Sequence, residues 1–334
     1  MYYSDLVPEE LVSAVFQPMT AQTLTQCRRP LDIKLRFTDG KKDLRLGTVC
    51  VSVEDRKWLY EIRLSRLLMQ FLTRYFFCIA HDLDNINGIA LTGWRNTTTR
   101  SAMVEEADES LKKWALVRHV HELSEDLAID GDRIELFLHC ISELWTFLLY
   151  HETTHVTHGH LRFADECLYL SDPAYSRAME FDADRTAVIW SKSKLGVNLP
   201  VWTRGTQALG KLTSINPHFI AFVVSNAFAA TRSFSGSGSD KYLPHEIRHF
   251  WALSQILDGS GLGVKDEAEL VIKYLAESTN LMMRVAGRDQ LQKPTLIMDI
   301  DFQDQIEWFG RVSQGYSTLH SDWAMYGFLS DPSA

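Results

Sequence analysis

The sequence contains no apolar segment long enough to cross a membrane. The longest one, Phe219 to Ala230, has about twelve residues, whereas a membrane-spanning helix needs about 20. The first residues, Met1 to Asp5, have neither the basic start nor the apolar core of a secretory signal. The sequence therefore predicts a soluble protein with no membrane partner.

Paired cysteines and an excess of positive charge are also lacking. The cysteines are five in number and scattered, with no C-x-x-C pair, which is typical of reduced thiols in a cytoplasmic protein. They are Cys27, Cys50, Cys78, Cys140 and Cys167. The net charge is −9, whereas nucleic acids and anionic membrane surfaces attract a basic protein face. We therefore expect a cytoplasmic protein that does not bind nucleic acid.

Strand patterns occur only near the N-terminus. Leu31 to Phe37 alternates apolar and polar residues, Asp39-Gly40 is a hairpin signal, and Leu44 to Val53 is rich in β-branched residues. These features predict two or three antiparallel strands.

Most of the chain after Ser65 has helical periodicity, whereas His81 to Arg100 is less regular. The expected helices cover residues 9–16, 65–80, 104–127, 133–158, 202–212, 217–231, 245–257, 265–286 and 304–312. The sequence thus predicts a mainly α protein of the α+β class with a small N-terminal antiparallel sheet. We interpret residues 1–100, with the sheet, and the helical region 101–334 as parts of one continuous domain.

One helical segment carries the pattern H-E-x-x-H at residues 151–155, where it ends the apolar run from Ile134 to Tyr150. On a helix, His151 and His155 project from one face, one turn apart, and can hold one divalent metal ion. Glu152 would point to the open side, where it can take a proton from metal-bound water. The pattern alone also fits a coincidental histidine pair on a buried helix.

A third metal ligand is available 25 residues after His155, at Glu180. Asp172-Pro173 is a typical helix start, which places Glu180 in mid-helix, facing the two histidines. Asp184 lies one turn later on the same face and is expected to accept the second ring N–H of a ligand histidine. Zinc suits this set best, since a catalytic zinc site has three protein ligands and one open position.

Together, His151–His155 and Glu180-x-x-Ala183-Asp184 resemble the gluzincin metallopeptidases, whose motifs are H-E-x-x-H and E-x-x-A-D. The continuation Gly159-His160 and the short chain are most similar to the family of the soluble phage-exclusion protease Lit. The membrane-bound HtpX-type and CAAX-processing peptidases share the second motif. The resemblance covers roughly residues 133–190. It implies a zinc endopeptidase that cleaves a cellular protein in defence against phage, with an activating partner that the residues do not identify.

Two neighbouring histidines compete with Glu180 as the third ligand. His158 is seven residues from His151, within about 20° of the same face on a continuing helix. However, Gly159 is a natural helix terminator, and three ligands in a row on one helix cannot surround a metal ion. His160 would suit a metzincin only at a different spacing. We therefore prefer Glu180.

A second H-E-x-x-H pattern lies at His245–His249 and opens a helix after Pro244, with no E-x-x-A-D after it. It predicts either a second zinc site or, by the family resemblance, groups that stabilise the oxyanion. Tyr242, His245 and Arg248 are the candidates, because they follow the flexible segment Ser233–Asp240. A surface helix with solvated charges is the alternative.

The family resemblance also implies an edge strand that pairs with substrate. Asn87–Gly93 fits this role, and a plain loop with one short strand fits equally well. Ser225–Ala229 matches the edge-strand motif of that family more closely. It lies in a helical segment downstream of the H-E-x-x-H helix, however, so we interpret the match as accidental.

Two other functions remain open. One is a metal-dependent sensor or scaffold with the same fold, which would be indicated by loss of the base, yet Glu152 is present. The other is a regulatory protease that cleaves a repressor or partner. Such proteins usually carry a DNA-binding module, and the sequence contains no basic helix-turn-helix pattern.

Overall fold

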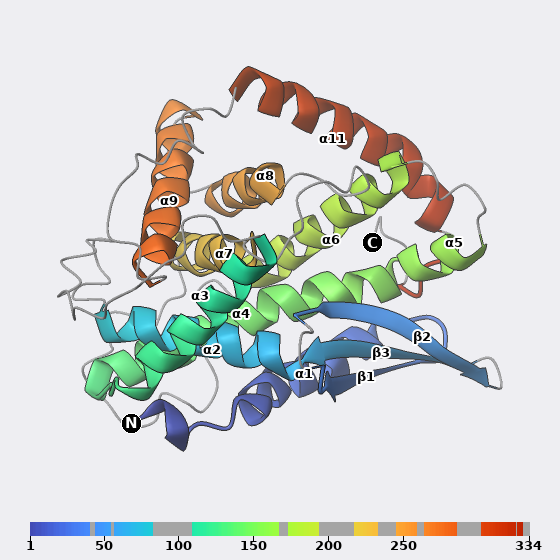
Figure 1. The fold of residues 1–334 in the computed structure, drawn as a ribbon. Coiled ribbons are helices and arrows are strands. Elements are labelled where there is room, and N and C mark those ends of the chain that lie inside the picture. Colours follow the sequence, from blue (N-terminus) through green and yellow to red (C-terminus); the bar gives the residue numbers. More distant parts are fainter. Residues whose placement is uncertain are drawn as a thin grey trace.

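A computed structural model describes residues 1–40, 44–54, 57–82, 109–166, 173–193, 217–232, 245–258, 264–285, 302–324 and 326–329. The protein is mainly helical, with a small sheet near the N-terminus (Figure 1). The elements before the central helix are η1 (Tyr3–Asp5), α1 (Pro8–Thr25), β1 (Leu31–Thr38), β2 (Leu46–Glu54), β3 (Lys57–Ser65), α2 (Arg66–Asp82) and α3 (Glu109–Glu125). They are followed by α4 (Gly131–Thr157), α5 (His160–Glu166), α6 (Pro173–Ser193), α7 (Pro217–Arg232), α8 (His245–Leu257), α9 (Val264–Val285) and α11 (Phe302–Ala324). Among the described helices, none combines the length and the apolar character that a bilayer span requires.

Most predicted helices are confirmed with small shifts of their ends, but α1 runs from Pro8 to Thr25, well beyond the predicted residues 9–16. Residues 245–257 form α8 as predicted, whereas the last helix, α11, extends well beyond the predicted residues 304–312. The helix predicted at 202–212 lies outside the described residues.

The sheet is mixed, and the prediction of an antiparallel sheet was wrong in this respect. Its order is β1-β3-β2, in which β1 pairs with β3 in parallel and β2 pairs with β3 in antiparallel fashion. Asp39-Gly40 is therefore not a hairpin turn, since β1 and β2 are not neighbours. The central strand β3 buries its inward residues Tyr60, Ile62 and Leu64 completely.

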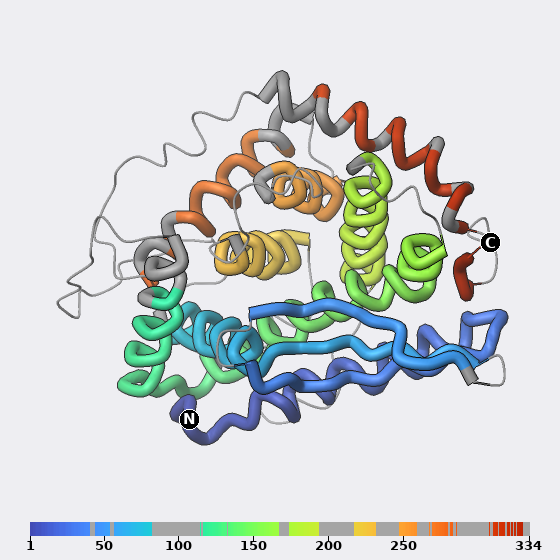
Figure 2. Tube along the Cα trace, turned by 45° about the vertical axis from the view of Figure 1, so that its right-hand side comes forward, coloured from blue at the N-terminus to red at the C-terminus, as the bar shows by residue number. Residues whose placement is uncertain are grey.

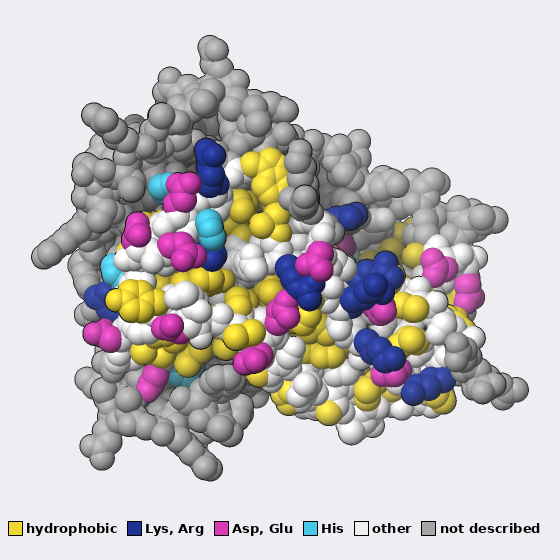
Figure 3. Space-filling model, turned by 60° about the horizontal axis from the view of Figure 1, so that its bottom comes forward, with side chains coloured by type: hydrophobic (Ala, Val, Ile, Leu, Met, Phe, Trp, Pro, Cys, Tyr) yellow, Lys and Arg dark blue, Asp and Glu magenta, His cyan; other side chains and the backbone are white. Residues whose placement is uncertain are grey.

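Charged side chains cover the solvent side of this region. Figure 3 shows Lys and Arg lying beside Asp and Glu on the face that includes α1 and the sheet. Ion pairs join Arg36 and Arg63 to Glu61, at 3.4 and 3.1 Å. Exposed pairs of this kind stabilise a fold little, so burial of the opposite side accounts for most of the sheet's stability.

Helix α4 runs through the middle of the molecule. It packs against α1, α2, α6 and α7 and against strands β2 and β3. In Figures 1 and 2, α6 lies on one side of it and the sheet on the other. Its residues Phe137, Leu144 and Trp145 are fully buried. The prediction of a helix surrounded by other elements is thus confirmed, and such a helix holds its side chains rigidly.

The C-terminal end of α4 is set by a glycine and by the end of the chain. Gly159 has a φ of 88°, a left-handed conformation that ends α4 and lets α5 begin at His160. The backbone N–H of Phe328 donates to the carbonyl of Thr157 over 2.7 Å. This bond satisfies one of the carbonyl groups that a helix end leaves unpaired.

We predict that Gly159→Ala lowers the free energy of unfolding by about 1–2 kcal/mol, because an L side chain is strained at this φ. Chemical denaturation with an unchanged m-value measures the loss. Gly47→Ala is the matched control, since a Cβ at Gly47 meets nothing within 4 Å and its φ is not positive. Equal losses in the two variants would contradict the role of Gly159.

Candidate metal centre

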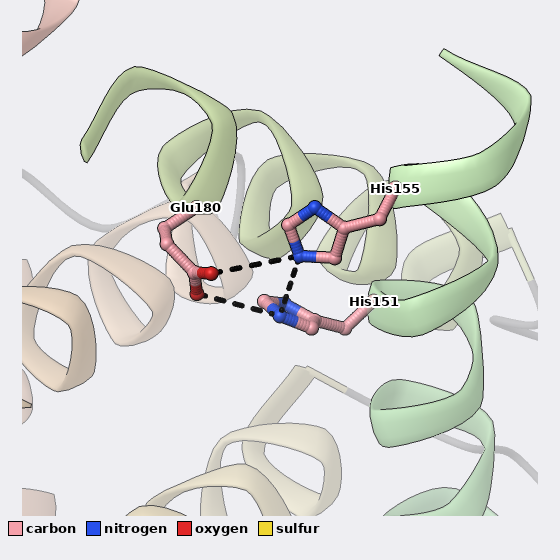
Figure 4. Close-up of side chains that lie close together, drawn as sticks. All are labelled: His151, His155 and Glu180. Carbon is pink, nitrogen blue, oxygen red and sulfur yellow. Dashed lines mark hydrogen bonds and ion pairs between the residues drawn. The ribbon is translucent and has the colours of Figure 1, made fainter. Parts of the chain in front are cut away.

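Helices α4 and α6 bring together two imidazoles and one carboxylate (Figure 4). The Nε2 atoms of His151 and His155 are 3.2 Å apart. Glu180 faces both, with its Oε2 3.5 Å from Nε2 of His151 and its Oε1 3.6 Å from Nε2 of His155. The arrangement follows from local geometry, since the histidines lie one turn apart on α4 and Glu180 lies in mid-helix on α6 after the predicted start at Pro173.

The spacing of these three ligand atoms suits a metal ion. Bonds of about 2.0–2.1 Å in a tetrahedral arrangement place neighbouring ligand atoms about 3.3 Å apart. The observed distances of 3.2, 3.5 and 3.6 Å lie close to this value. The group His151, His155 and Glu180 can therefore hold a metal ion.

Asp184 lies one turn after Glu180 and makes the contact that the sequence predicted. Its Oδ1 is 2.9 Å from Nδ1 of His151. Arg248 on α8 binds the same carboxylate with two parallel bonds, from Nε over 2.7 Å and from Nη2 over 2.8 Å. The remaining amino group, Nη1, lies 3.0 Å from Oε2 of Glu180. Arg248 thus reaches the site, where its guanidinium contacts the carboxylates of Asp184 and Glu180.

These contacts determine the charges in the centre. Burial alone would raise the pKa of Asp184, but the Arg248 guanidinium outweighs it and holds that pKa far below its usual range. Burial would lower the pKa of His151, but the bond to Asp184 outweighs it and raises that pKa. For His155, burial and the neighbouring imidazoles of His151 and His160 hold the pKa well below its usual value. His155 is therefore neutral, as a metal ligand must be.

Glu152 lies beside the metal group in the wall of a cavity of about 550 Å³, which His151, His155, Glu180 and Arg248 also line. Its Oε2 accepts a hydrogen bond from the hydroxyl of Thr48 on β2 over 2.8 Å. Burial raises the pKa of Glu152, whereas His151 and the bond from Thr48 lower it and offset part of this effect.

A second group lies behind His155 and consists of His158, His160 and Asp182. The Nδ1 of His160 is 3.0 Å from Nδ1 of His155, and its Nε2 is 3.0 Å from Oδ2 of Asp182. His158 does not join Glu180 as a metal ligand, because α4 ends at Thr157 and the His158 ring turns to Asp182, with 2.6 Å between Nδ1 and Oδ2.

The downstream candidates are only partly described. Tyr242 lies outside the described residues, and His245 begins α8 without a described side chain. His249 is buried with its Nε2 2.7 Å from Oγ of Ser225. That bond directs His249 to α7, and among the described residues His249 belongs to no group that could hold a metal ion.

The substrate strand predicted at Asn87–Gly93 also lies outside the described residues. Within the described sheet, β2 is an edge strand, and its residues Leu46, Gly47 and Thr48 line the cavity. Ser225–Ala229 is part of helix α7, in agreement with the interpretation that its match to an edge strand is accidental.

Sequence reasoning missed three features of the centre. They are the bond from Thr48 to Glu152, the contact of His160 with His155, and the role of Asp182 as the common partner of His158 and His160. Only the crowding of four histidines into residues 151–160 was a signal. Nothing in the sequence links Thr48 to a glutamate 104 residues away.

The chain matches no known protein in any of three comparisons, with models of protein families, with curated proteins and with solved structures.

Proposed function

We propose that this protein is a zinc-dependent endopeptidase. The observation that carries the proposal is the triangle of His151, His155 and Glu180, with the carboxylate of Glu152 beside it in an accessible cavity. Two imidazoles and one carboxylate are the ligand set of several catalytic zinc sites, which keep one position open.

The chain's own residues supply the proton transfers. A bound zinc ion would lower the pKa of a water molecule and polarise the carbonyl group that is attacked. Glu152 takes the proton from the attacking water and passes it to the departing amine nitrogen. The buried site raises the pKa of Glu152, and a higher pKa makes its carboxylate a stronger base toward the water proton.

The cavity favours a peptide substrate with an apolar side chain. Phe147, Leu148 and Phe228 contribute to its lining, next to the metal group. We propose that an extended segment of the substrate pairs with β2, an edge strand of the described sheet, through backbone hydrogen bonds that do not depend on sequence. Apolar contacts in the cavity would then select the side chain beside the cleaved bond.

The same residues support membership of the gluzincins and, within them, similarity to the phage-exclusion protease Lit family. Glu180 and Asp184 of E-x-x-A-D contact the histidines of H-E-x-x-H as that family's motifs imply. On this proposal the protein acts in the cytoplasm on a cellular protein.

We predict one zinc ion per chain, measured by elemental analysis after purification. Glu180→Ala removes one of three ligands, so zinc affinity should fall by about 1000-fold in competition with a chelator. His158→Ala is the control at the rival position and should keep its zinc. Loss of zinc from His158→Ala alone would show that His158 is the third ligand.

Glu152→Gln should keep the fold and bound zinc but lose proteolysis by several orders of magnitude, since an amide cannot accept the water proton. Incubation with a bacterial lysate, followed by mass spectrometry of new peptide termini, measures this loss. Cleavage at the wild-type rate would remove Glu152 from the mechanism. A zinc-loaded wild type that cleaves nothing would favour the sensor or scaffold.

Thr48→Val removes the hydroxyl that donates to Glu152 while keeping the shape of the side chain. That bond lowers the pKa of Glu152, so its loss raises this pKa, and the acid limb of the kcat/KM profile should move up by about one pH unit. Thr48→Ser keeps the hydroxyl and should restore the wild-type profile. Two profiles that coincide would show that Thr48 does not act on the base.

A further inference from the structure

The second ring nitrogen of His155 faces another histidine instead of a carboxylate. Nδ1 of His155 and Nδ1 of His160 are 3.0 Å apart, and Nε2 of His160 is 3.0 Å from Oδ2 of Asp182. His160 and Asp182 are each only 1% exposed. Water therefore has little access to these atoms, and their hydrogen bonds must be complementary.

The proton positions follow from the chemistry of imidazole. A neutral ring has one N–H donor and one acceptor nitrogen. If Nε2 of His155 binds a metal ion, its Nδ1 carries the proton and donates to Nδ1 of His160. The proton of His160 is then on Nε2, where it donates to Asp182. Each N–H in this series of hydrogen bonds then has an acceptor, and no other placement of the protons on the two neutral rings achieves this.

We propose that His160 and Asp182 are positioning residues that hold His155 in the tautomer and ring orientation that bind the metal through Nε2. This inference rests on the proposed zinc site and adds two residues that neither motif specifies.

The hydrogen-bonded series from His155 through His160 to Asp182, which we call the relay, lies at the break between α4 and α5. The left-handed Gly159 turns the chain so that His160, five residues after His155, lies against it. His158 shares Oδ2 of Asp182 over 2.6 Å, and its ring lies edge-on to that of His160, with the ring centroids 6.0 Å apart. His158 is therefore a natural control for His160.

The relay also makes a second metal ion between His158, His160 and Asp182 incompatible with the first. A metal ion on Nε2 of His160 would move its proton to Nδ1, which would then face the Nδ1–H of His155. Two donors 3.0 Å apart repel each other. The cluster that resembles a second metal site thus serves the first one.

The test compares His160→Phe with His158→Phe in the full chain. Each variant removes one imidazole from Asp182, but only the first interrupts the contact with His155. Zinc affinity, measured by competition with a chelator, should fall by about 10–100-fold in His160→Phe and change little in His158→Phe. His160→Gln can both accept and donate a hydrogen bond, so it should recover part of the lost affinity.

NMR of protein labelled with 15N at histidine gives an independent readout. In the zinc-loaded wild type, His155 should carry its proton on Nδ1 and His160 on Nε2. Equal zinc affinity in wild type and His160→Phe, or a proton on Nδ1 of His160, would overturn the relay and leave the zinc site intact. Two zinc ions per chain, one of them lost in His158→Phe, would also overturn it. A wild type that binds no zinc would defeat the proposed function and, with it, the relay.

Discussion

The candidate centre depends on one buried carboxylate. Asp184 on α6 is 1% exposed and joins three helices, since it binds His151 of α4 and Arg248 of α8. A buried charge is tolerated only when its partners compensate it, and removal of one partner costs several kcal/mol. The mutual placement of α4, α6 and α8 is therefore tied to the same carboxylate that orients His151, a histidine of the candidate centre.

The two histidines of the centre are supported in different ways. His151 donates to a charged carboxylate, whereas His155 contacts a neutral imidazole that passes the interaction on to Asp182. A charged partner raises the basicity of an imidazole more strongly than a neutral one. The two histidines thus differ in basicity, because the second ring nitrogen of His151 faces a carboxylate and that of His155 faces an imidazole.

Helix α6 supplies all three carboxylates of this arrangement. Glu180 faces the two ligand histidines, Asp184 binds His151 and Arg248, and Asp182 binds the pair His158 and His160. Two of them, Asp182 and Asp184, are almost completely enclosed. These carboxylates and the histidine-rich end of α4 therefore need each other, because neither set of polar groups could be buried alone.

The sequence by itself determined the parts of the site that lie within one helix. The distance from His151 to His155 and that from Glu180 to Asp184 are each one helical turn, so the 3.6-residue period places each pair on one face whatever surrounds it. The apolar run before His151 likewise predicted a buried helix. Tertiary structure decided the rest. Strand β3 lies between β1 and β2, so the hairpin signal at Asp39-Gly40 was overridden, and Thr48 reaches Glu152 only because β2 packs against α4. Arg248 meets Asp184, 64 residues earlier, because α8 packs against α6. Contacts of this kind depend on how whole elements pack, and no local period of the chain records that packing.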